Sequence, residues 1–282
     1  MKNMKILIAI STYKERENIE ELIAKINLVS PSSTILIIND NSNDGTKEAI
    51  QKISNKNLIY LERPKKLGLG TAHKLSIFYA IKFNYDFLVT MDADFSHDPA
   101  HISFLLNKAG TDNFVIGSRF CKGAKSDYIG LRKIVSKLGN YVSRKLLNIQ
   151  LLEITTYFRV YSVKLLKKLP FNELNAQGYS LGVKLVWFMK KINANLIEVP
   201  IHFKDRNKGK SKIPRLQIFI SAFDLFLLKL EDIFFKPKFT DKNLTYNFKI
   251  SCEHCKNGFF TLVKNNNYKC LVCNEDQYLK NE

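Results

Sequence analysis

DFLVTMDADFSHDP, residues 86–99, joins an apolar run to three closely spaced aspartates. The run is short and almost wholly apolar, which is typical of a strand buried on both faces of a parallel sheet. Asp92 and Asp94 follow this strand directly. Asp98 precedes Pro99 at the start of a helical pattern, and we expect it to cap that helix rather than to take part in chemistry. The stretch therefore predicts a strand, a carboxylate pair and then a helix.

The same strand-then-helix pattern occurs four more times in the first 147 residues. The pairs are KILIAIST with ENIEELIAKI, TILIIND with DGTKEAIQKI, NLIYLERP with GTAHKLSIFYAIKF, and NFVIGSRF with LRKIVSKLGNYVSRKLL. A later strand, NLIEVPIHF, precedes a basic loop at residues 204–212. Repeated units of this kind predict an α/β domain whose mostly parallel sheet has helices on both faces.

Ligands of such sheets bind beyond the carboxyl ends of the strands. The residues at those ends are Thr12, Asp40, Glu62, Asp92 to Asp94 and Arg119. If the chain stays extended, Asp92 and Asp94 point the same way, and two carboxylates held together favour a hard cation such as Mg²⁺ or Mn²⁺ between them. A solvated acidic turn is the alternative. The sequence has neither GxGxxG nor GxxxxGK[ST], which argues against dinucleotide and P-loop enzymes.

Seven motifs in a fixed order make the prediction more specific. They are STYKERENI, DNSNDGT, RPKKLGLGTA, MDADFSHDP, VIGSRF, LRKIVSKLGN and DRNKGKSK. In these motifs the chain resembles family 2 glycosyltransferases, most closely the polyisoprenyl-phosphate hexose synthases of the dolichol-phosphate mannose synthase type. The resemblance covers roughly residues 4–213 and implies a GT-A nucleotide-sugar-binding domain over residues 1–212.

The resemblance also implies roles for individual residues on the donor side. The nucleotide would contact Ser11, Tyr13, Glu15 and Asp40. Asp92 and Asp94 would hold Mg²⁺ or Mn²⁺ on the diphosphate, and Ser96 falls where relatives carry a polar residue near the metal. Asp94, together with Arg119 and Arg206, is a candidate catalytic residue.

On the acceptor side the resemblance implies a cluster of cations. Arg119, Arg132, Arg206 and Lys212 match positions that bind the acceptor phosphate and the diphosphate, and Ser136 matches an acceptor-side position. A phosphate acceptor is already ionised and needs positive charge, whereas a hydroxyl acceptor needs a base. No acidic residue occurs between Glu173 and Glu198. This absence favours a phosphate acceptor, and the resemblance implies inverting transfer of a hexose, of the mannose or glucose type, from a nucleoside-diphosphate sugar to polyprenyl or dolichyl phosphate.

Several positions depart from the family pattern around the sugar and acceptor pockets. They are Asn39, the segment EITTYFR at residues 153–159, Gly182 and Lys184. Glu153 is the only candidate base on that side. Transfer to a hydroxyl of a surface polysaccharide or glycolipid is one alternative, and a non-catalytic nucleic-acid-binding or scaffold protein on the same fold is another. The retained site residues favour the enzyme, and nucleic acid is not the expected partner.

The net charge of +18 is concentrated in the second part of the chain. Residues 1–120 hold 15 Lys and Arg against 13 Asp and Glu, and the remainder holds 29 against 13. This excess of positive charge favours an anionic partner, which could be a lipid headgroup, a phosphorylated substrate or nucleic acid. The short apolar run at the N-terminus reads as a strand rather than a signal peptide. We expect a cytoplasmic protein that is peripheral on the cytoplasmic face of a membrane.

Residues 214–235 form an amphipathic helical pattern within a predicted linker at residues 213–239. The pattern is too interrupted by charge to span a membrane. Its polar stripe consists of Gln217, Ser221, Asp224, Glu231 and Asp232. This helix suits a membrane interface, a homodimer seam or ordinary packing, and its acidic stripe argues against the membrane because surface-bound helices usually carry Lys and Arg there.

The last segment, residues 240–282, carries two CxxC pairs. Cys252, Cys255, Cys270 and Cys273 have the spacing of a zinc ribbon, in which four thiolates bind structural Zn²⁺. Two disulfides are the alternative, which the expected cytoplasmic location disfavours. We expect a small zinc-ribbon-like module that binds nucleic acid or protein, or that serves as a docking or dimerisation module.

Overall fold

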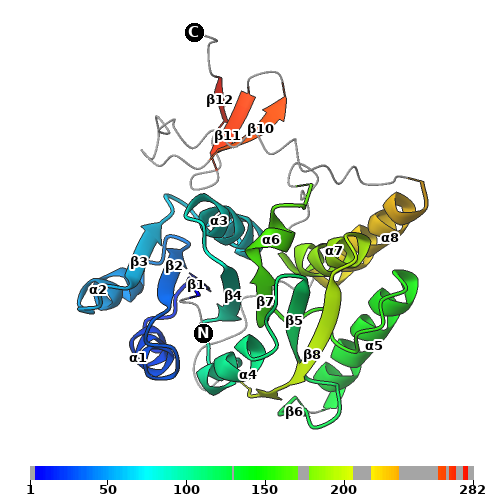
Figure 1. Cartoon of the computed structure of the whole chain (residues 1–282), viewed down its shortest axis with the longest axis horizontal. Helices are drawn as coiled ribbons and strands as arrows, with labels where there is room; N and C mark the ends of the chain where they lie inside the picture. The colour runs from blue at the N-terminus through cyan, green and yellow to red at the C-terminus, as the bar shows by residue number, and fades with distance from the viewer. Residues whose placement is uncertain are drawn as a thin grey trace.

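The computed structural model describes residues 4–128, 130–170, 178–205, 217–234, 260–264, 267–270 and 276–278. In this part of the chain the main sheet has seven strands in the order β3-β2-β1-β4-β7-β5-β8 (Figure 1). These strands are β1 (Ile6–Thr12), β2 (Thr34–Asn39), β3 (Leu58–Glu62), β4 (Phe87–Asp92), β5 (Asn113–Ser118), β7 (Arg159–Ser162) and β8 (Asn195–Pro200). A short parallel pair joins β6 (Lys125–Ser126) to β9 (His202–Phe203).

The helices connect these strands in the predicted order. They are α1 (Ile19–Val29), α2 (Thr46–Gln51), α3 (Leu69–Lys82), α4 (Ile102–Leu106), α5 (Gly130–Leu146), α6 (Val163–Leu166), α7 (Gly178–Lys191) and α8 (Gln217–Phe234), with one 3-10 turn at Pro99–His101. Asp98 caps that turn by accepting a hydrogen bond from the backbone nitrogen of Ala100 at 3.0 Å, which confirms the predicted cap.

The predicted mostly parallel sheet is confirmed, with one exception. Strand β7 lies between β4 and β5 and runs antiparallel to both. The sequence pattern does not indicate β7, because four residues are too few to show a period and the preceding segment has no strand pattern. Because Arg159 pairs with Thr90 and Ile116 near the carboxyl ends of β4 and β5, this strand begins near that edge of the sheet, directly after residues 153–158.

Both faces of the sheet are buried, as the continuous apolar strands require. In β1, Leu7 and Ala9 belong to the core that includes α3, α6 and α7, whereas Ile8 and Ile10 belong to the core that includes α1, α2 and α4. This alternation follows from the two-residue repeat of a strand. The result is a three-layer α/β sandwich with helices on both sides.

Strand register aligns the predicted ligand-binding ends. Ser11 is the register partner of Asp92, Thr12 that of Asn39, and Asn39 that of Glu62. The ends of β1, β2, β3 and β4 therefore form one continuous edge, and the residues that follow them lie above it.

Helix α8 packs against α7, and Figure 1 shows the two helices lying alongside each other. Its observed bounds agree with the predicted helix at residues 214–235. Among the described residues, no helix is long and apolar enough to cross a membrane.

Near the C-terminus, β10 (Phe260–Lys264), β11 (Asn267–Cys270) and β12 (Asp276–Tyr278) form an antiparallel sheet. Cys270 is buried at the end of β11. Cys252, Cys255 and Cys273 lie outside the described residues. The zinc ribbon and the domain boundaries at residues 212 and 240 therefore stay predictions.

Candidate active site

The loops after β1 and β2 are tied together on the predicted nucleotide side. The backbone nitrogen of Lys14 donates to Oγ of Ser42 at 2.8 Å, and that of Glu15 donates to Oγ1 of Thr46 at 3.1 Å. Lys14 has a positive φ of 59°, so the chain turns sharply here. These contacts hold Tyr13 and Glu15 at the edge of the sheet beside Ser11.

Asp40, predicted to contact the base of the nucleotide, is buried and anchors a loop. Its carboxylate accepts hydrogen bonds from the backbone nitrogens of Leu67 and Gly68 at 2.7 and 2.8 Å. The same carboxylate is paired with the fully buried guanidinium of Arg63 at 2.7 Å. Asp40 thereby fixes the start of α3. A contact between Asp40 and the base of the nucleotide would be a second role, beside this structural one.

Lys66 belongs to the loop that Asp40 fixes. Its Nζ lies 4.0 Å from the ring centroid of Tyr13, a distance suited to a cation–π contact. This contact places positive charge beside the predicted nucleotide-binding loop, and the sequence pattern does not single it out.

The carboxylate pair sits at a turn rather than on an extended chain. Strand β4 ends at Asp92, the chain bends over residues 93–96, and Phe95 has a left-handed φ of 61°. Asp94 accepts hydrogen bonds from the backbone nitrogen and the hydroxyl of Ser96, at 3.1 and 2.6 Å. The Asp92 side chain is 35% exposed, whereas Asp94 is buried. Their shared location therefore depends on this turn and not on strand alternation.

His97 supports this turn, and sequence reasoning did not identify it. Its Nδ1 accepts a hydrogen bond from the backbone nitrogen of Asp92 at 2.9 Å, so the ring proton is on Nε2, which donates to Oγ1 of Thr156 at 2.9 Å. Burial lowers the pKa of His97 to about 3. The imidazole is therefore neutral, and its 3.7 Å approach to the Asp92 carboxylate is not an ion pair. His97 also bridges to Phe203, just before the basic loop.

Arg119 follows β5 and is held by a buried carboxylate. Its Nε donates to Oε2 of Glu153 at 2.6 Å, and its Nη2 donates to Oγ1 of Thr155 at 2.9 Å. The other oxygen of Glu153 accepts from the backbone nitrogens of Thr155 and Thr156 at 2.8 and 3.2 Å. Burial acts to raise the pKa of Glu153, but Arg119 and the Thr155 hydrogen bonds outweigh it and lower the pKa. Glu153 is thus the counter-ion of Arg119 and is not placed to act as a base.

The segment before β7 is also fixed from α5 and β8. Oδ1 of Asn140, on α5, accepts from the backbone nitrogen of Ile154 at 2.9 Å, and the Glu198 carboxylate accepts from those of Leu152 and Glu153 at 2.9 and 3.0 Å. Ser136 lies one turn before Asn140 on α5 and is partly exposed. Arg132 is on the first turn of α5, but its side chain lies outside the described residues, as do Arg206 and Lys212.

Two of the departures from the family pattern, Gly182 and the segment at residues 153–159, pack directly against each other. A Cβ added to Gly182 would lie 3.1 Å from Cζ of Tyr157 and 3.2 Å from Nη2 of Arg159. Arg159 is fully buried and donates to the backbone oxygens of Thr156, Gly182 and Ile154. The small residue at 182 therefore makes room for the large one at 157.

Lys184, another departure from the family pattern, binds α8. Its Nζ pairs with Glu231 at 2.8 Å, Lys191 pairs with Asp232 at 2.6 Å, and the indole nitrogen of Trp187 donates to Asp232 at 2.9 Å. The structure corrects the interpretation of the acidic stripe of α8. Glu231 and Asp232 face α7, so they do not argue against a membrane on the opposite face of α8.

Comparison with known proteins identifies the family. The model for Glycosyl transferase family 2 matches residues 7–170, which include the carboxylate turn and the Arg119 network. The chain belongs to glycosyl transferase family 2. It is therefore a glycosyltransferase, and the sequence prediction of this enzyme class is confirmed.

Within this family the chain is similar to two curated proteins. A polyprenol monophosphomannose synthase of Mycolicibacterium smegmatis is 33% identical over 213 residues, which cover 73% of this chain and 80% of the relative. An undecaprenyl-phosphate mannosyltransferase of Micrococcus luteus is 32% identical over 213 residues, with coverage of 74% and 88%.

The fold is similar to that of a solved glycosyltransferase. Glucosyl-3-phosphoglycerate synthase of Mycobacterium tuberculosis, in complex with Mn²⁺, UDP and glucosyl-3-phosphoglycerate, has a TM-score of 0.57 and 17% identity. The match covers 82% of this chain and 80% of the solved chain. At this identity the likeness shows the fold alone, and it confirms the predicted GT-A architecture.

Proposed function

We propose that the protein transfers a hexose from a nucleoside-diphosphate sugar to a polyprenyl phosphate with inversion. An acceptor phosphate oxygen attacks the anomeric carbon, and the bond from that carbon to the diphosphate breaks. The observation that carries the proposal is the state of Glu153. Both of its oxygens are occupied by Arg119 and the backbone of Thr155 and Thr156, which leaves a buried, well-positioned cation where a hydroxyl acceptor would need a base.

A divalent cation fits the donor side of this proposal. Asp92 and Asp94 offer hard carboxylate oxygens beside the nucleotide-binding edge, which suits Mg²⁺ or Mn²⁺, and among the described residues no cluster of three His, Cys, Asp or Glu completes a protein-only site. The remaining ligands would be diphosphate oxygens and water. When bound, the cation neutralises charge that develops on the leaving diphosphate. Ser96 and His97 hold the turn that carries the two carboxylates.

Two exposed apolar surfaces support peripheral association of the protein with a membrane. On α8 the exposed residues are Phe223, Phe226, Leu227, Ile233 and Phe234. On α5 they are Ile134, Val135, Leu138, Tyr141, Val142 and Leu146. Apolar residues in such numbers on two helices suit the interface of the bilayer that would contain a polyprenyl acceptor. A homodimer seam is the alternative for the same surfaces.

An activity assay tests the proposal directly. Purified protein is incubated with a panel of nucleotide sugars and short-chain polyprenyl phosphate, with Mn²⁺ or with EDTA. We expect lipid-linked sugar that disappears with EDTA and falls at least about 100-fold in Asp94→Asn, since this exchange removes a charged metal ligand. Asp98→Asn is the matched control, because Asp98 caps a helical turn and should retain activity. Transfer only to a sugar hydroxyl, or transfer unaffected by EDTA, would contradict the mechanism.

Structural Zn²⁺ in the C-terminal segment is a separate proposal. Its support is the spacing of the four cysteines and the antiparallel strands between them. Metal analysis of the purified protein should give about one zinc per chain, and Cys255→Ser with Cys273→Ser should remove it. Zinc content unchanged in the double variant would rule out this site.

A further inference from the structure

His97 lies between the donor side and the acceptor side of the candidate site. Its imidazole is fully buried and packs against the rings of Phe158 and Phe203, with ring centroids 5.0 and 5.5 Å away. The contact with Phe158 is stacked, and the contact with Phe203 is edge-on. Because the imidazole cannot turn in this close packing without losing both contacts, its two nitrogens point at fixed partners.

A continuous chain of hydrogen bonds runs from His97 in both directions. On one side its Nδ1 accepts from the backbone nitrogen of Asp92 at 2.9 Å. On the other side its Nε2 donates to Oγ1 of Thr156 at 2.9 Å, and the backbone nitrogen of Thr156 donates to Glu153 at 3.2 Å. Glu153 in turn accepts from Nε of Arg119 at 2.6 Å. His97, Thr156 and Glu153 are all buried, and we call these three residues the buried bridge.

A ring contact adds a second connection between His97 and Arg119. The guanidinium carbon of Arg119 lies 4.9 Å from the ring centroid of Phe203, the same ring that the imidazole of His97 meets edge-on. Phe203 is buried, so it has little room to shift independently. The position of Arg119 therefore depends on His97 through the counter-ion Glu153 and also through the ring beneath its guanidinium.

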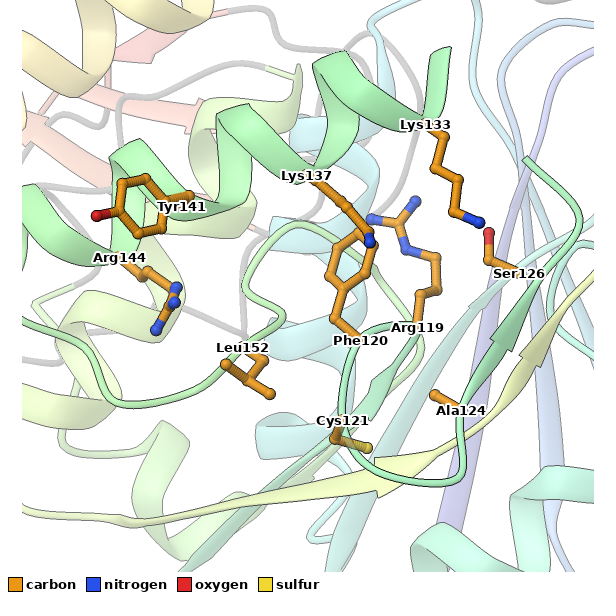
Figure 2. A pocket seen from close by; sticks show the side chains of 10 residues that line it. All are labelled: Arg119, Phe120, Cys121, Ala124, Ser126, Lys133, Lys137, Tyr141, Arg144 and Leu152. Carbon is orange, nitrogen blue, oxygen red and sulfur yellow. The ribbon is translucent and has the colours of Figure 1, made fainter. Parts of the chain in front are cut away.

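The two ends of the buried bridge are accessible to ligands. At one end the Asp92 side chain is 35% exposed, beside the predicted nucleotide-binding edge. At the other end Arg119 lines a cavity of about 450 Å³ on the acceptor side, together with Lys133 and Lys137. Figure 2 shows both lysines reaching from α5 toward the segment that begins at Arg119. The bridge thus joins a site that suits a cation to a site that suits a phosphate.

We propose that His97 and Thr156 are positioning residues that couple these two sites, so that a metal-bound nucleotide and an acceptor phosphate each favour binding of the other. A ligand at either end orders the buried bridge, and the second ligand then meets groups that are already ordered. The coupling is reciprocal, because linkage requires each ligand to change the affinity of the other by the same factor. The inference rests on the proposed function, which supplies the two ligands.

Isothermal titration calorimetry measures this coupling without any sugar transfer. The dissociation constant of UDP with Mn²⁺, and separately that of GDP with Mn²⁺, is determined in the absence and in the presence of saturating geranyl phosphate. The ratio of the two constants for one nucleotide is the coupling factor. For the wild type we expect geranyl phosphate to tighten nucleotide binding at least about fivefold, at the lower end of coupling between sites in proteins.

Two exchanges break the buried bridge at different atoms. In His97→Asn the amide oxygen takes the place of Nδ1 as acceptor for the Asp92 nitrogen, but no group replaces Nε2. Thr156→Val removes the hydroxyl with little change in shape, whereas Thr156→Ser keeps it. We expect His97→Asn and Thr156→Val to lower the coupling factor at least about threefold, and Thr156→Ser to keep the wild-type factor. Thr156→Val carries the test alone if His97→Asn does not fold.

Thr90→Val is the matched control. Thr90 is buried on β4, and its hydroxyl donates to the backbone oxygen of Tyr157 at 2.7 Å. The exchange therefore removes a buried hydroxyl beside the same segment without removing a hydrogen bond of the buried bridge, and it should keep the coupling factor.

The possible outcomes separate the coupling from the proposed function. A coupling factor that is unchanged in Thr156→Val would mean that the two ligands act on each other by charge alone, and it would overturn the proposal. An equal loss in Thr90→Val or Thr156→Ser would also overturn it, because any disturbance of the segment would then suffice. A wild type that binds both ligands without coupling refutes the buried bridge alone. A wild type that binds no nucleotide, or no geranyl phosphate, refutes the proposed function together with the bridge.

Discussion

The buried ion pair between Arg119 and Glu153 offers the sharpest test of the site. Glu153 has no exposed surface, and the Arg119 side chain is only 7% exposed. In Glu153→Gln, the side-chain amide must point its NH₂ group either at Nε of Arg119 or at the backbone nitrogens of Thr155 and Thr156. Either orientation places donor against donor and leaves a buried guanidinium without a counter-ion. Removing one partner of such a pair costs about 3–5 kcal/mol of unfolding free energy.

For a chain of 282 residues the loss corresponds to a fall in melting temperature of roughly 5–8 °C. Differential scanning calorimetry and urea denaturation measure it. Glu198→Gln is the matched control, because Glu198 also binds the backbone of this segment but has no cation partner within the described residues, so we expect a loss of only about 1 kcal/mol. If Glu153→Gln melts within about 2 °C of the wild type, or no lower than the control, the pair does not hold the segment as argued.

Three further predictions concern the packing around the site. His73 is buried on α3 and stacks on Tyr157 with the ring centroids 3.9 Å apart. Burial lowers its pKa to about 3, so below pH 6.5 the unfolded chain binds a proton at this residue that the folded chain does not. His73 should therefore contribute about 2 kcal/mol to the loss of stability between pH 7 and 5, and urea denaturation of His73→Phe should show a loss smaller by that amount. Gly182→Ala should lower the unfolding free energy by about 1–3 kcal/mol, because the added carbon would press against Tyr157. Tyr157→Phe removes the hydroxyl that would lie 3.2 Å from this carbon. Calorimetry of the double variant should therefore show part of the lost stability recovered. Lys184→Glu should lower stability by roughly 2 kcal/mol by facing Glu231, whereas the double exchange with Glu231→Lys should restore it; a double variant no more stable than the single one would contradict the pairing.

The strands and their ends were predictable because their signals are local. A run such as DFLVTMDAD contains its own evidence for a buried strand and for carboxylates at its end, and Asp98 before Pro99 contains its own evidence for a cap. Repetition of that pattern was enough to predict the α/β sandwich, whereas the glycosyltransferase class was predicted from the resemblance of seven ordered motifs to family 2. These features depend on neighbours within a few residues, which a sequence records directly.

What the sequence did not reveal depends on partners far along the chain. Strand β7 is too short to show a pattern, and it forms because β4 and β5 offer edges on both sides. The sequence offers Glu153 as a candidate base. In the structure its carboxylate accepts a hydrogen bond from Arg119, which lies 34 residues earlier in the chain. The role of His97 likewise depends on its contacts with Asp92 and Thr156, and no local pattern in the sequence indicates the contact with Thr156.

The sequence by itself determined the order of the strand-helix units, the carboxylate pair at the end of β4 and the amphipathic character of α8. Only the tertiary structure decided which face of α8 is outward, because Lys184 and Lys191 on α7 draw its acidic residues inward. It also decided that Arg119 meets a buried counter-ion, Glu153. A side chain's charge is recorded in the sequence, but its effect depends on burial and on the partner that folding brings to it.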